Sequence, residues 1–296
     1  MKNILIVLCV GITFSLMFSS GQIENPDTHL RLTQTRIIVD DHSFGLPNNV
    51  GEDSHGNIAV NSKGKRYMVY NIGQSIVFIP IYIFAENFTS SSTSAYYLAA
   101  FLVSFINYLI HVICTFLLFK IGIELSGDKK TSIIAALFFG LTSYSFVFAQ
   151  STYEHHFEML AVLVCYYLAL NKNFRNIGVL IGLCVSIGMV FRTTTIFVVP
   201  GIVLLLNNRK YTLQILISSA IGVIGVLLYN YLRFDNIFQT GYSLAWSLAH
   251  GKYLNEFWSI KDIVKSIFGF VFSPGKGLLF FSTTMFISLF YFRFFY

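Results

Sequence analysis

Long apolar runs separated by short polar turns make up most of the chain. A helix that crosses the roughly 30 Å hydrocarbon layer of a membrane needs about 20 predominantly apolar residues. The clearest runs near this length cover residues 4–20, 95–119, 131–149, 157–170, 213–232 and 277–292. The pattern predicts an all-α polytopic membrane protein in which these runs are transmembrane helices.

Two further runs depart from this simple pattern. Residues 177–206 form a longer run that Arg192 interrupts and that contains Pro200. As one helix this run would reach about 45 Å, which is more than a membrane requires. We therefore expect two short crossings joined by a turn at residues 192–194, which brings the total to about eight. The run 72–85 is short and contains Pro80, so we expect an interfacial or re-entrant helix on the outer side.

The positive residues of the short connections predict the orientation, because Lys and Arg collect on the inner side of a membrane. With the N-terminus inside, the inner segments contain Lys2, Lys120, Lys129, Lys130, Lys172, Arg175, Arg209, Lys210 and Arg293. The short outer turns at residues 86–94 and 150–153 contain no Lys or Arg. We expect one transmembrane domain over residues 1–296, with large outer segments at residues 21–94 and 233–276. Residues 4–20 also fit a cleaved signal peptide, since Lys2 precedes a short apolar core.

Composition agrees with a membrane protein and excludes several other classes. Charged residues are 11% of the chain and apolar residues 55%, whereas a soluble domain has about 25% charged residues. These values exclude a soluble domain, a disordered chain, a coiled coil and a disulfide scaffold. The net charge of +6 is scattered between apolar runs, so it does not predict binding to nucleic acid. The four cysteines lie inside apolar runs and are expected to be small buried hydrophobes.

Asp27 follows the first apolar run closely and is the candidate catalytic carboxylate. Local sequence alone favours a helix N-cap at this position, because Asp before a periodic apolar run is a common helix start. A carboxylate held at the outer membrane face can instead accept a proton from an acceptor hydroxyl. Arg31 lies one helical turn later, where it can orient this carboxylate or pair with it.

A second polar group opens the run 157–170 from the outer side. Glu154 and Glu158 are four residues apart, and His155 and Glu158 are three apart, so each pair shares a helix face. Carboxylates and imidazoles at this spacing can bind a divalent metal or contact a polar substrate. They are also typical of a hydrated helix end. All three interpretations remain open from the residues alone.

Arg192 and Lys276 are candidate anion-binding residues. A charge as deep in apolar sequence as Arg192 usually faces a partner or a cavity, although a snorkelling structural Arg is the alternative. Lys276 lies between two glycines in residues 273–277, which suits an anion contact or a tight turn. The predicted topology places Asp27, Glu154, His155, Arg192 and Lys276 on one side of the membrane. Charged groups gathered at one face predict a polar cavity there.

Several ordered segments resemble bacterial glycosyltransferases of the GT-C superfamily that use a polyprenyl-phosphate sugar donor. These enzymes are relatives of protein O-mannosyltransferases and lipid A aminoarabinose transferases. The matching segments are Pro26-Asp27-Thr28 with Arg31 to Arg36, Tyr67 to Tyr70 with Gly73-Gln74-Ser75 and Pro80, Gly182-Leu183 with Phe191-Arg192-Thr193, Asn230 to Phe234 with Gln239 to Tyr242, and Phe272 to Leu278. They are short but follow the same order over nearly the whole chain.

The resemblance implies a GT-C fold and transfer of a sugar to a hydroxyl of a lipid, glycan or protein acceptor. The reaction would take place at the outer face of the bacterial cytoplasmic membrane, with membrane lipids as further partners. Asp27 matches the catalytic base, and the lipid phosphate would lie against Arg192 and Lys276. Tyr67 and Tyr70 are expected to contact substrate, together with Arg31, Glu154 and His155. No cofactor is implied with certainty, and a divalent metal remains an open alternative.

The chain departs from the family pattern in three places. Val69 stands where related sequences often have a lysine, for which Lys65 or Arg66 can substitute. Glu154-His155-His156 stands where relatives often have Glu followed by Pro. The chain also stops directly after a predicted crossing, whereas such enzymes usually continue. These departures leave two alternatives to an active enzyme, namely a truncated noncatalytic relative and a polytopic transporter or lipid flippase.

Overall fold

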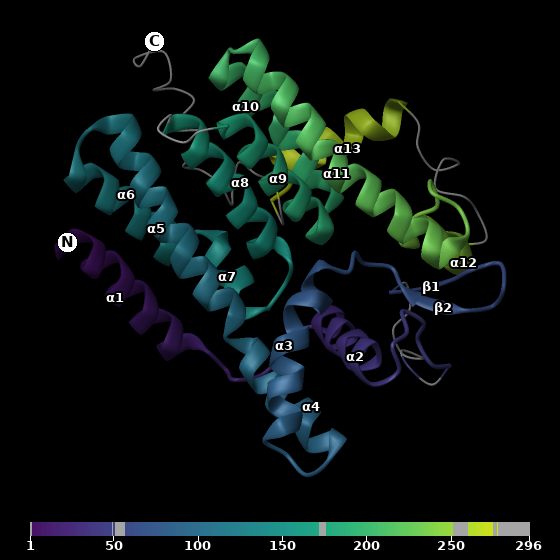
Figure 1. Ribbon diagram of the computed structural model, residues 1–296. Helices are drawn as coiled ribbons and strands as arrows, with labels where there is room; N and C mark the ends of the chain where they lie inside the picture. Colours follow the sequence, from purple (N-terminus) through teal and green to yellow (C-terminus); the bar gives the residue numbers. More distant parts are fainter. Residues whose placement is uncertain are drawn as a thin grey trace. The chain divides into compact units, whose positions relative to one another are not determined.

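The computed structural model describes residues 2–48, 50, 57–171, 176–250, 260–274 and 277, and most of them are helical (Figure 1). The helices are α1 (Lys2–Phe18), α2 (Pro26–Asp40), α3 (Gly73–Asn87), α4 (Ser92–Ser104), α5 (Ile106–Ser126), α6 (Lys129–Thr142), α7 (Tyr144–Gln150), α8 (His155–Leu170), α9 (Ile177–Phe191), η1 (Thr193–Phe197), α10 (Val198–Leu206), α11 (Arg209–Phe234), α12 (Gly241–His250) and α13 (Ile260–Phe272). Two short antiparallel strands, β1 (Ile58–Val60) and β2 (Arg66–Met68), form a hairpin. The helical prediction is confirmed, and the hairpin is an addition to it. The chain forms two compact units, Met1–Ala245 and Trp246–Tyr296.

Membrane-spanning length is reached by fewer helices than the sequence predicts. Within the described residues, Ser92–Ser126 and Arg209–Phe234 are long and apolar enough to cross a membrane. A third span results if α6 and α7, which meet at a bend of 49°, count as one. Helices α8, α9 and α10 have only 16, 15 and 9 residues. The structure therefore supports membrane helices but does not show eight crossings; the run 278–292 lies outside the described residues.

Breaks within the predicted runs have local causes. The break at Arg192 is confirmed: its backbone is extended, with φ −142° and ψ 123°, between α9 and η1. The run 131–149, expected as one helix, is broken at Ser143. The Ser143 backbone is extended, and its side chain accepts a hydrogen bond from the Ser145 N–H, so it starts α7 as an N-cap. The run 95–119 begins earlier, in α4, and continues through α5 to Ser126.

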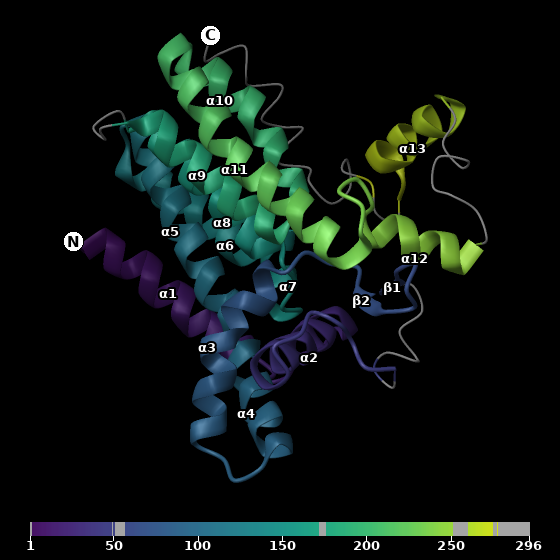
Figure 2. The ribbon, with the colours of Figure 1, turned by 45° about the vertical axis from the view of Figure 1, so that its right-hand side comes forward.

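Helices α9 and α11 run side by side because small residues line their contact (Figures 1 and 2). A Cβ atom added to Gly182 would lie 2.7 Å from the Ile215 carbonyl oxygen of α11, and one added to Gly222 would lie 2.6 Å from Ser186 Cα. The Ser186 hydroxyl donates a hydrogen bond to the Ser218 carbonyl oxygen over 2.7 Å. Close backbone approach through small residues, with a hydroxyl bridging the helices, is typical of membrane helix pairs.

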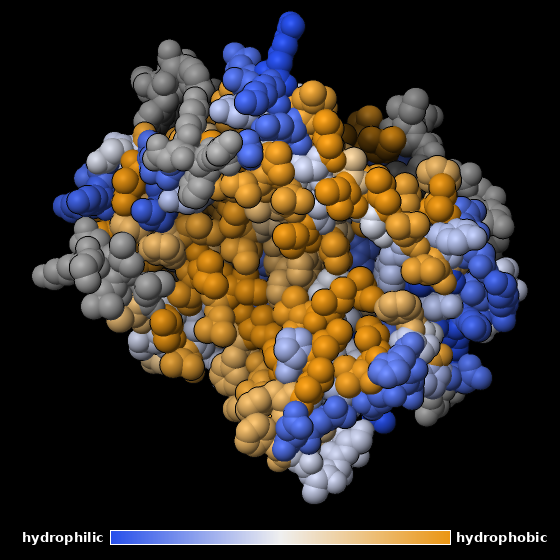
Figure 3. Space-filling model, in the orientation of Figure 1, coloured by the Kyte–Doolittle hydropathy of each residue, from blue (hydrophilic) through white to orange (hydrophobic). Residues whose placement is uncertain are grey.

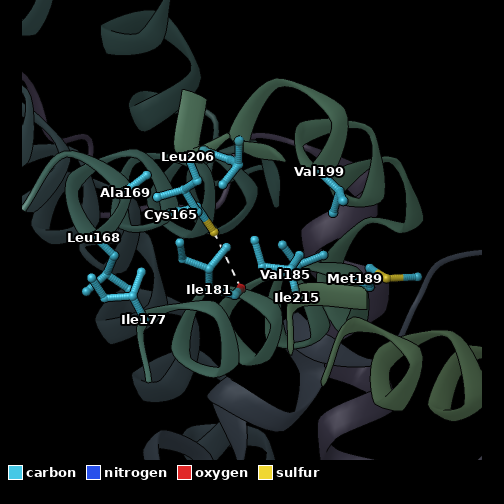
Figure 4. Packing of buried hydrophobic residues seen from close by; sticks show 11 residues of the cluster. Cys165, Leu168, Ala169, Ile177, Ile181, Val185, Met189, Val199, Leu206 and Ile215 are labelled. Carbon is cyan, nitrogen blue, oxygen red and sulfur yellow. Dashed lines mark hydrogen bonds between the residues drawn. The ribbon is translucent and has the colours of Figure 1, made fainter. Parts of the chain in front are cut away.

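A core of buried apolar residues packs α9 and α11 against α8 and α10. The buried residues of this core are Cys165, Leu168, Ala169, Ile177, Ile181, Val185, Met189, Val199, Ile202, Leu206 and Ile215 (Figure 4). Cys165 and Ile181 come from α8 and α9, and the Cys165 thiol lies 3.7 Å from the Ile181 carbonyl oxygen. The expectation that cysteines are buried hydrophobes holds for Cys114 and Cys165, while Cys9 is exposed and Cys184 is half-buried.

Residues 21–94, predicted as the first outer segment, contain α2, the hairpin, α3 and the start of α4. The Asn25 side chain accepts a hydrogen bond from the Thr28 N–H over 2.7 Å, and Pro26 occupies the first helical position. Asn25 is therefore the N-cap of α2, and Asp27 is not, because Pro26 shifts the start of the helix by two residues. Asp40 ends α2. The run 72–85 forms α3 with Pro80 inside it.

Apolar side chains cover much of the helical surface, as expected for lipid contact. Figure 3 shows orange side chains gathered over the middle of the helical layer, with blue side chains above and below. Exposed large apolar residues occur on α5, α6, α9 and α11, for example Leu109, Phe138, Ile187 and Ile217. An apolar band between polar rims is typical of a protein that sits in a bilayer.

Candidate functional site

A charged cluster forms where α2, α8 and α9 meet. Arg31 of α2 forms an ion pair with Glu154, the residue just before α8, and their side chains are only 1% and 9% exposed. Arg192, just after α9, lies with Nη1 3.5 Å from Glu154 Oε1 and with Nε 3.2 Å from Glu158 Oε2. Residues far apart in the sequence thus meet in one network of alternating charge.

His155 and Thr194 add hydrogen bonds to this network. Arg192 Nη1 donates to His155 Nδ1 over 2.8 Å, so this ring nitrogen accepts a hydrogen bond and carries no proton. The Thr194 hydroxyl donates to Glu158 Oε1 over 2.6 Å. The guanidinium of Arg192 is therefore held by three neighbours while about a third of its side chain remains exposed.

Asp27 is connected to the charged cluster through Asn57 and Tyr70. Asn57 Nδ2 donates to Asp27 Oδ1 over 3.2 Å, and the Tyr70 hydroxyl donates to Asn57 Oδ1 over 2.8 Å. The guanidinium of Arg31 lies 4.0 Å from the centre of the Tyr70 ring. Burial and a hydrogen bond with Asp27 raise the pKa of Tyr70, so its phenol stays protonated near neutral pH. Asp27 itself is half-buried.

A cavity of about 450 Å³ borders the cluster. Its polar lining residues are Asn71, Glu154, Arg192, Thr193, Thr194, Asn230, Arg233, Thr240 and Tyr242. Its apolar lining residues are Val69, Phe191, Val226, Leu227, Ile237 and Phe238. Asp27 is not a lining residue of this cavity; it is linked through Asn57 to Tyr70, whose ring meets that of the lining residue Tyr242 edge to face at 6.0 Å. Burial, with the charge of Glu154, raises the pKa of Tyr242.

Arg233 is a lining residue to which the sequence argument gave no role. It is 2% exposed, and its Nη1 donates to the carbonyl oxygens of Met68 and Tyr70 over 2.8 and 3.1 Å. Its guanidinium also lies 3.9 Å from the centre of the Tyr229 ring. Arg233 thereby fixes the backbone that carries Tyr70. In the sequence, the sign of such a role is an Arg directly after the apolar run 213–232.

The structure brings six of the eight candidate residues together: Asp27, Arg31, Tyr70, Glu154, His155 and Arg192. Tyr67 is apart from them, because it points into the packing of the hairpin, with its ring 5.8 Å from that of Phe234. Lys276 lies outside the described residues. His156 also turns away, toward His111, with 3.3 Å between His156 Nε2 and His111 Nδ1. Glu158, which the sequence grouped with Glu154 and His155, also joins the site through Arg192, and Asn57 and Tyr242 join it without having been candidates.

The two proposed substitutes for a missing lysine are not at the cavity. Val69 is 3% exposed and belongs to the cavity wall. Arg66 donates instead to the carbonyl oxygens of Asn48 and Val50, the latter over 3.0 Å. Lys65 is exposed on the hairpin turn. Neither Lys65 nor Arg66 therefore supplies the positive charge that a lysine at position 69 would bring to the cavity.

The arrangement of the acidic and histidine side chains also tests the predicted alternative of a divalent metal site. Across the residues that the structure describes, no group of three or more His, Cys, Asp or Glu side chains is placed to hold one. Glu154, His155 and Glu158 converge on Arg192 instead. A guanidinium at the centre of the three donors disfavours a cation there, because like charges repel.

Chemically, the site combines a half-buried carboxylate, arginines paired with glutamates, and a cavity lined by both polar and apolar side chains. The carboxylate can accept a proton, the guanidinium groups can bind an anion, and the apolar lining residues can contact a hydrocarbon chain. Comparison of the chain with protein-family models, with curated proteins and with solved structures found no significant match.

Proposed function

We propose that the chain is an integral membrane glycosyltransferase that takes its sugar from a polyprenyl-phosphate donor. The acceptor is a hydroxyl of a lipid, glycan or protein at the outer membrane face. The observation that carries this proposal is the cavity lined by Glu154, Arg192 and several apolar residues, with Arg31 and Asp27 in the network that borders it. A lipid-linked phosphate has the matching chemistry, with an anion for Arg192 and a hydrocarbon chain for the apolar lining residues.

In the proposed reaction, the Asp27 carboxylate accepts the proton of the acceptor hydroxyl. The acceptor oxygen forms a bond to the anomeric carbon of the sugar, and the bond between that carbon and the phosphate oxygen breaks. The phosphate leaves with the bonding electron pair, and Arg192 stabilises its charge. Tyr70 and Asn57 hold Asp27 in position. Lys276 is a second proposed phosphate contact, on grounds of sequence alone.

The test is sugar transfer by the purified chain in liposomes that contain a panel of polyprenyl-phosphate sugars. The wild-type chain should release polyprenyl phosphate from at least one donor and pass the sugar to a lipid acceptor. Asp27→Asn should lower the rate by about 10²–10⁴-fold, because a positioned base contributes roughly that much. Membrane insertion should be unchanged.

Asp40→Asn is the matched control, since Asp40 closes the same helix and pairs with Arg36 over 3.4 Å at the surface. This variant should transfer sugar at the wild-type rate. Full activity of Asp27→Asn would remove the proposed base. A wild-type chain that consumes none of the donors would contradict the enzyme proposal and favour the transporter or the noncatalytic relative.

A further inference from the structure

Helix α13 has a sharply divided surface. Its large apolar side chains are between 44% and 65% exposed: Ile263, Val264, Ile267, Phe268, Phe270 and Phe272. With 100° between successive residues, these positions fall on one side of the helix. Asp262, Lys265, Ser266 and Gly269 fall on the other. The helix is therefore amphipathic, and side chains on both its apolar and its polar side are exposed.

Helix α11 of the same chain shows how a crossing helix differs. It has 26 residues, and the side that packs on α9 includes the small residues Ser218 and Gly222. Helix α13 has 13 residues, which gives it a length of about 20 Å. This is shorter than the roughly 30 Å of a hydrocarbon layer, and its second side is charged and polar rather than small. The pattern suits a helix that lies along the membrane surface.

We propose that α13 is a membrane-interface helix that lies in the plane of the bilayer surface. Its apolar side is immersed at the boundary of head groups and acyl chains, and Asp262, Lys265 and Ser266 face the head groups and water. Such helices bury their apolar side about 5–10 Å into this boundary. The partner is lipid because the chain contains helices long and apolar enough to cross a membrane. A further apolar run, residues 277–292, follows α13 in the sequence. This inference does not depend on the proposed enzymatic activity.

Photocrosslinking in the full-length chain tests the inference. The photoreactive residue p-benzoylphenylalanine is placed at Phe268, on the apolar side, and in a separate chain at Ser266, almost opposite it on the polar side. Both positions are exposed, so neither change removes a buried side chain. The chains are reconstituted in phosphatidylcholine and phosphatidylglycerol vesicles, irradiated and analysed by mass spectrometry for lipid adducts.

The inference predicts at least about tenfold more lipid adduct at position 268 than at position 266, because only the apolar side reaches the acyl chains. Phe270 should behave as Phe268 does. Adducts between position 268 and other residues of the chain would show that the apolar side packs on protein, and would overturn the inference. Equal lipid labelling at 266 and 268 would overturn it as well, since it would indicate a crossing helix or one without a fixed orientation.

Discussion

Arg31 and Glu154 carry opposite charges where both side chains are almost fully shielded from water. Two charges removed from water are costly, and their mutual attraction offsets much of that cost only while both remain. Removal of one leaves the other buried without a partner. The Arg31 guanidinium also lies over the Tyr70 ring, so it would lose this contact if it turned toward solvent. This pair should therefore be the most sensitive point of the cluster.

Glu154→Gln is expected to lower the free energy of unfolding by about 3 kcal/mol, the lower end of the 3–5 kcal/mol typical of a broken buried pair. The comparison is Asp40→Asn, which breaks the exposed pair with Arg36 and should change stability by less than about 1 kcal/mol. Both are measured by unfolding in one detergent. Equal losses in the two variants would show that Glu154 does not neutralise a buried charge.

At the residue scale, Asp27, Glu154 and Arg192 could be identified as candidates because charged residues are rare in this chain. Their contact partners could not be predicted, since nothing in the local sequence links Arg31 to Glu154 or Asp27 to Asn57. Tyr67 was misplaced because the strand β2 was not foreseen, and pairing of Tyr67 with Ala59 directs its ring into the hairpin core. The cap of α2 was assigned to Asp27 although Pro26 favours an earlier start.

Contact between α9 and α11 depends on residues with little or no side chain. The approach is so close that a Cβ on Gly182 would lie 1.9 Å from Ser218 Oγ as well as 2.7 Å from a backbone oxygen. Ser218 can rotate, but the carbonyl of Ile215 cannot move without the helix. The same helix pair forms one wall of the core shown in Figure 4.

Gly182→Ala should therefore destabilise the protein by roughly 1–3 kcal/mol, the usual cost of overpacking. Gly225→Ala is the matched control, because an added Cβ at Gly225 in α11 meets nothing within 4 Å. There the change should be neutral or stabilising by about 0.5–1 kcal/mol, since Ala loses less entropy than Gly in a helix. Thermal unfolding of both variants measures this difference in stability. A stable Gly182→Ala protein would rule out this close packing.

At the element scale, most apolar runs became helices where the sequence predicted them, including the break at Arg192. A charge in an apolar run is a strong signal, which explains that success. The break at Ser143 was missed because serine is tolerated within membrane helices, and only its capping hydrogen bond reveals the start of α7. The strands have three residues each, too few for an alternating pattern to be recognised.

For the whole molecule, the decisive feature is a cavity that borders the Arg192 cluster and is lined by both polar and apolar side chains. Composition alone predicted a membrane protein, and the exposed apolar band agrees with it (Figure 3). The number of crossings could not be read reliably from run lengths, because short helices such as α10 pack against longer ones. A polar cavity near the charged residues was expected, but its lining residues could not be predicted, since they come from distant parts of the chain.

The most direct test of the central claim is to locate a bound lipid phosphate. A polyprenyl phosphate with a diazirine on its first isoprene unit is added to the reconstituted chain, irradiated, and its adducts are mapped by mass spectrometry. The account predicts adducts at Val226, Ile237 and Phe238 on the cavity wall. Excess unlabelled polyprenyl phosphate should reduce them, whereas polyprenol, which has no phosphate for Arg192, should not. Adducts spread over lipid-facing residues such as Leu216 and Ile221, or equal competition by polyprenol, would contradict it.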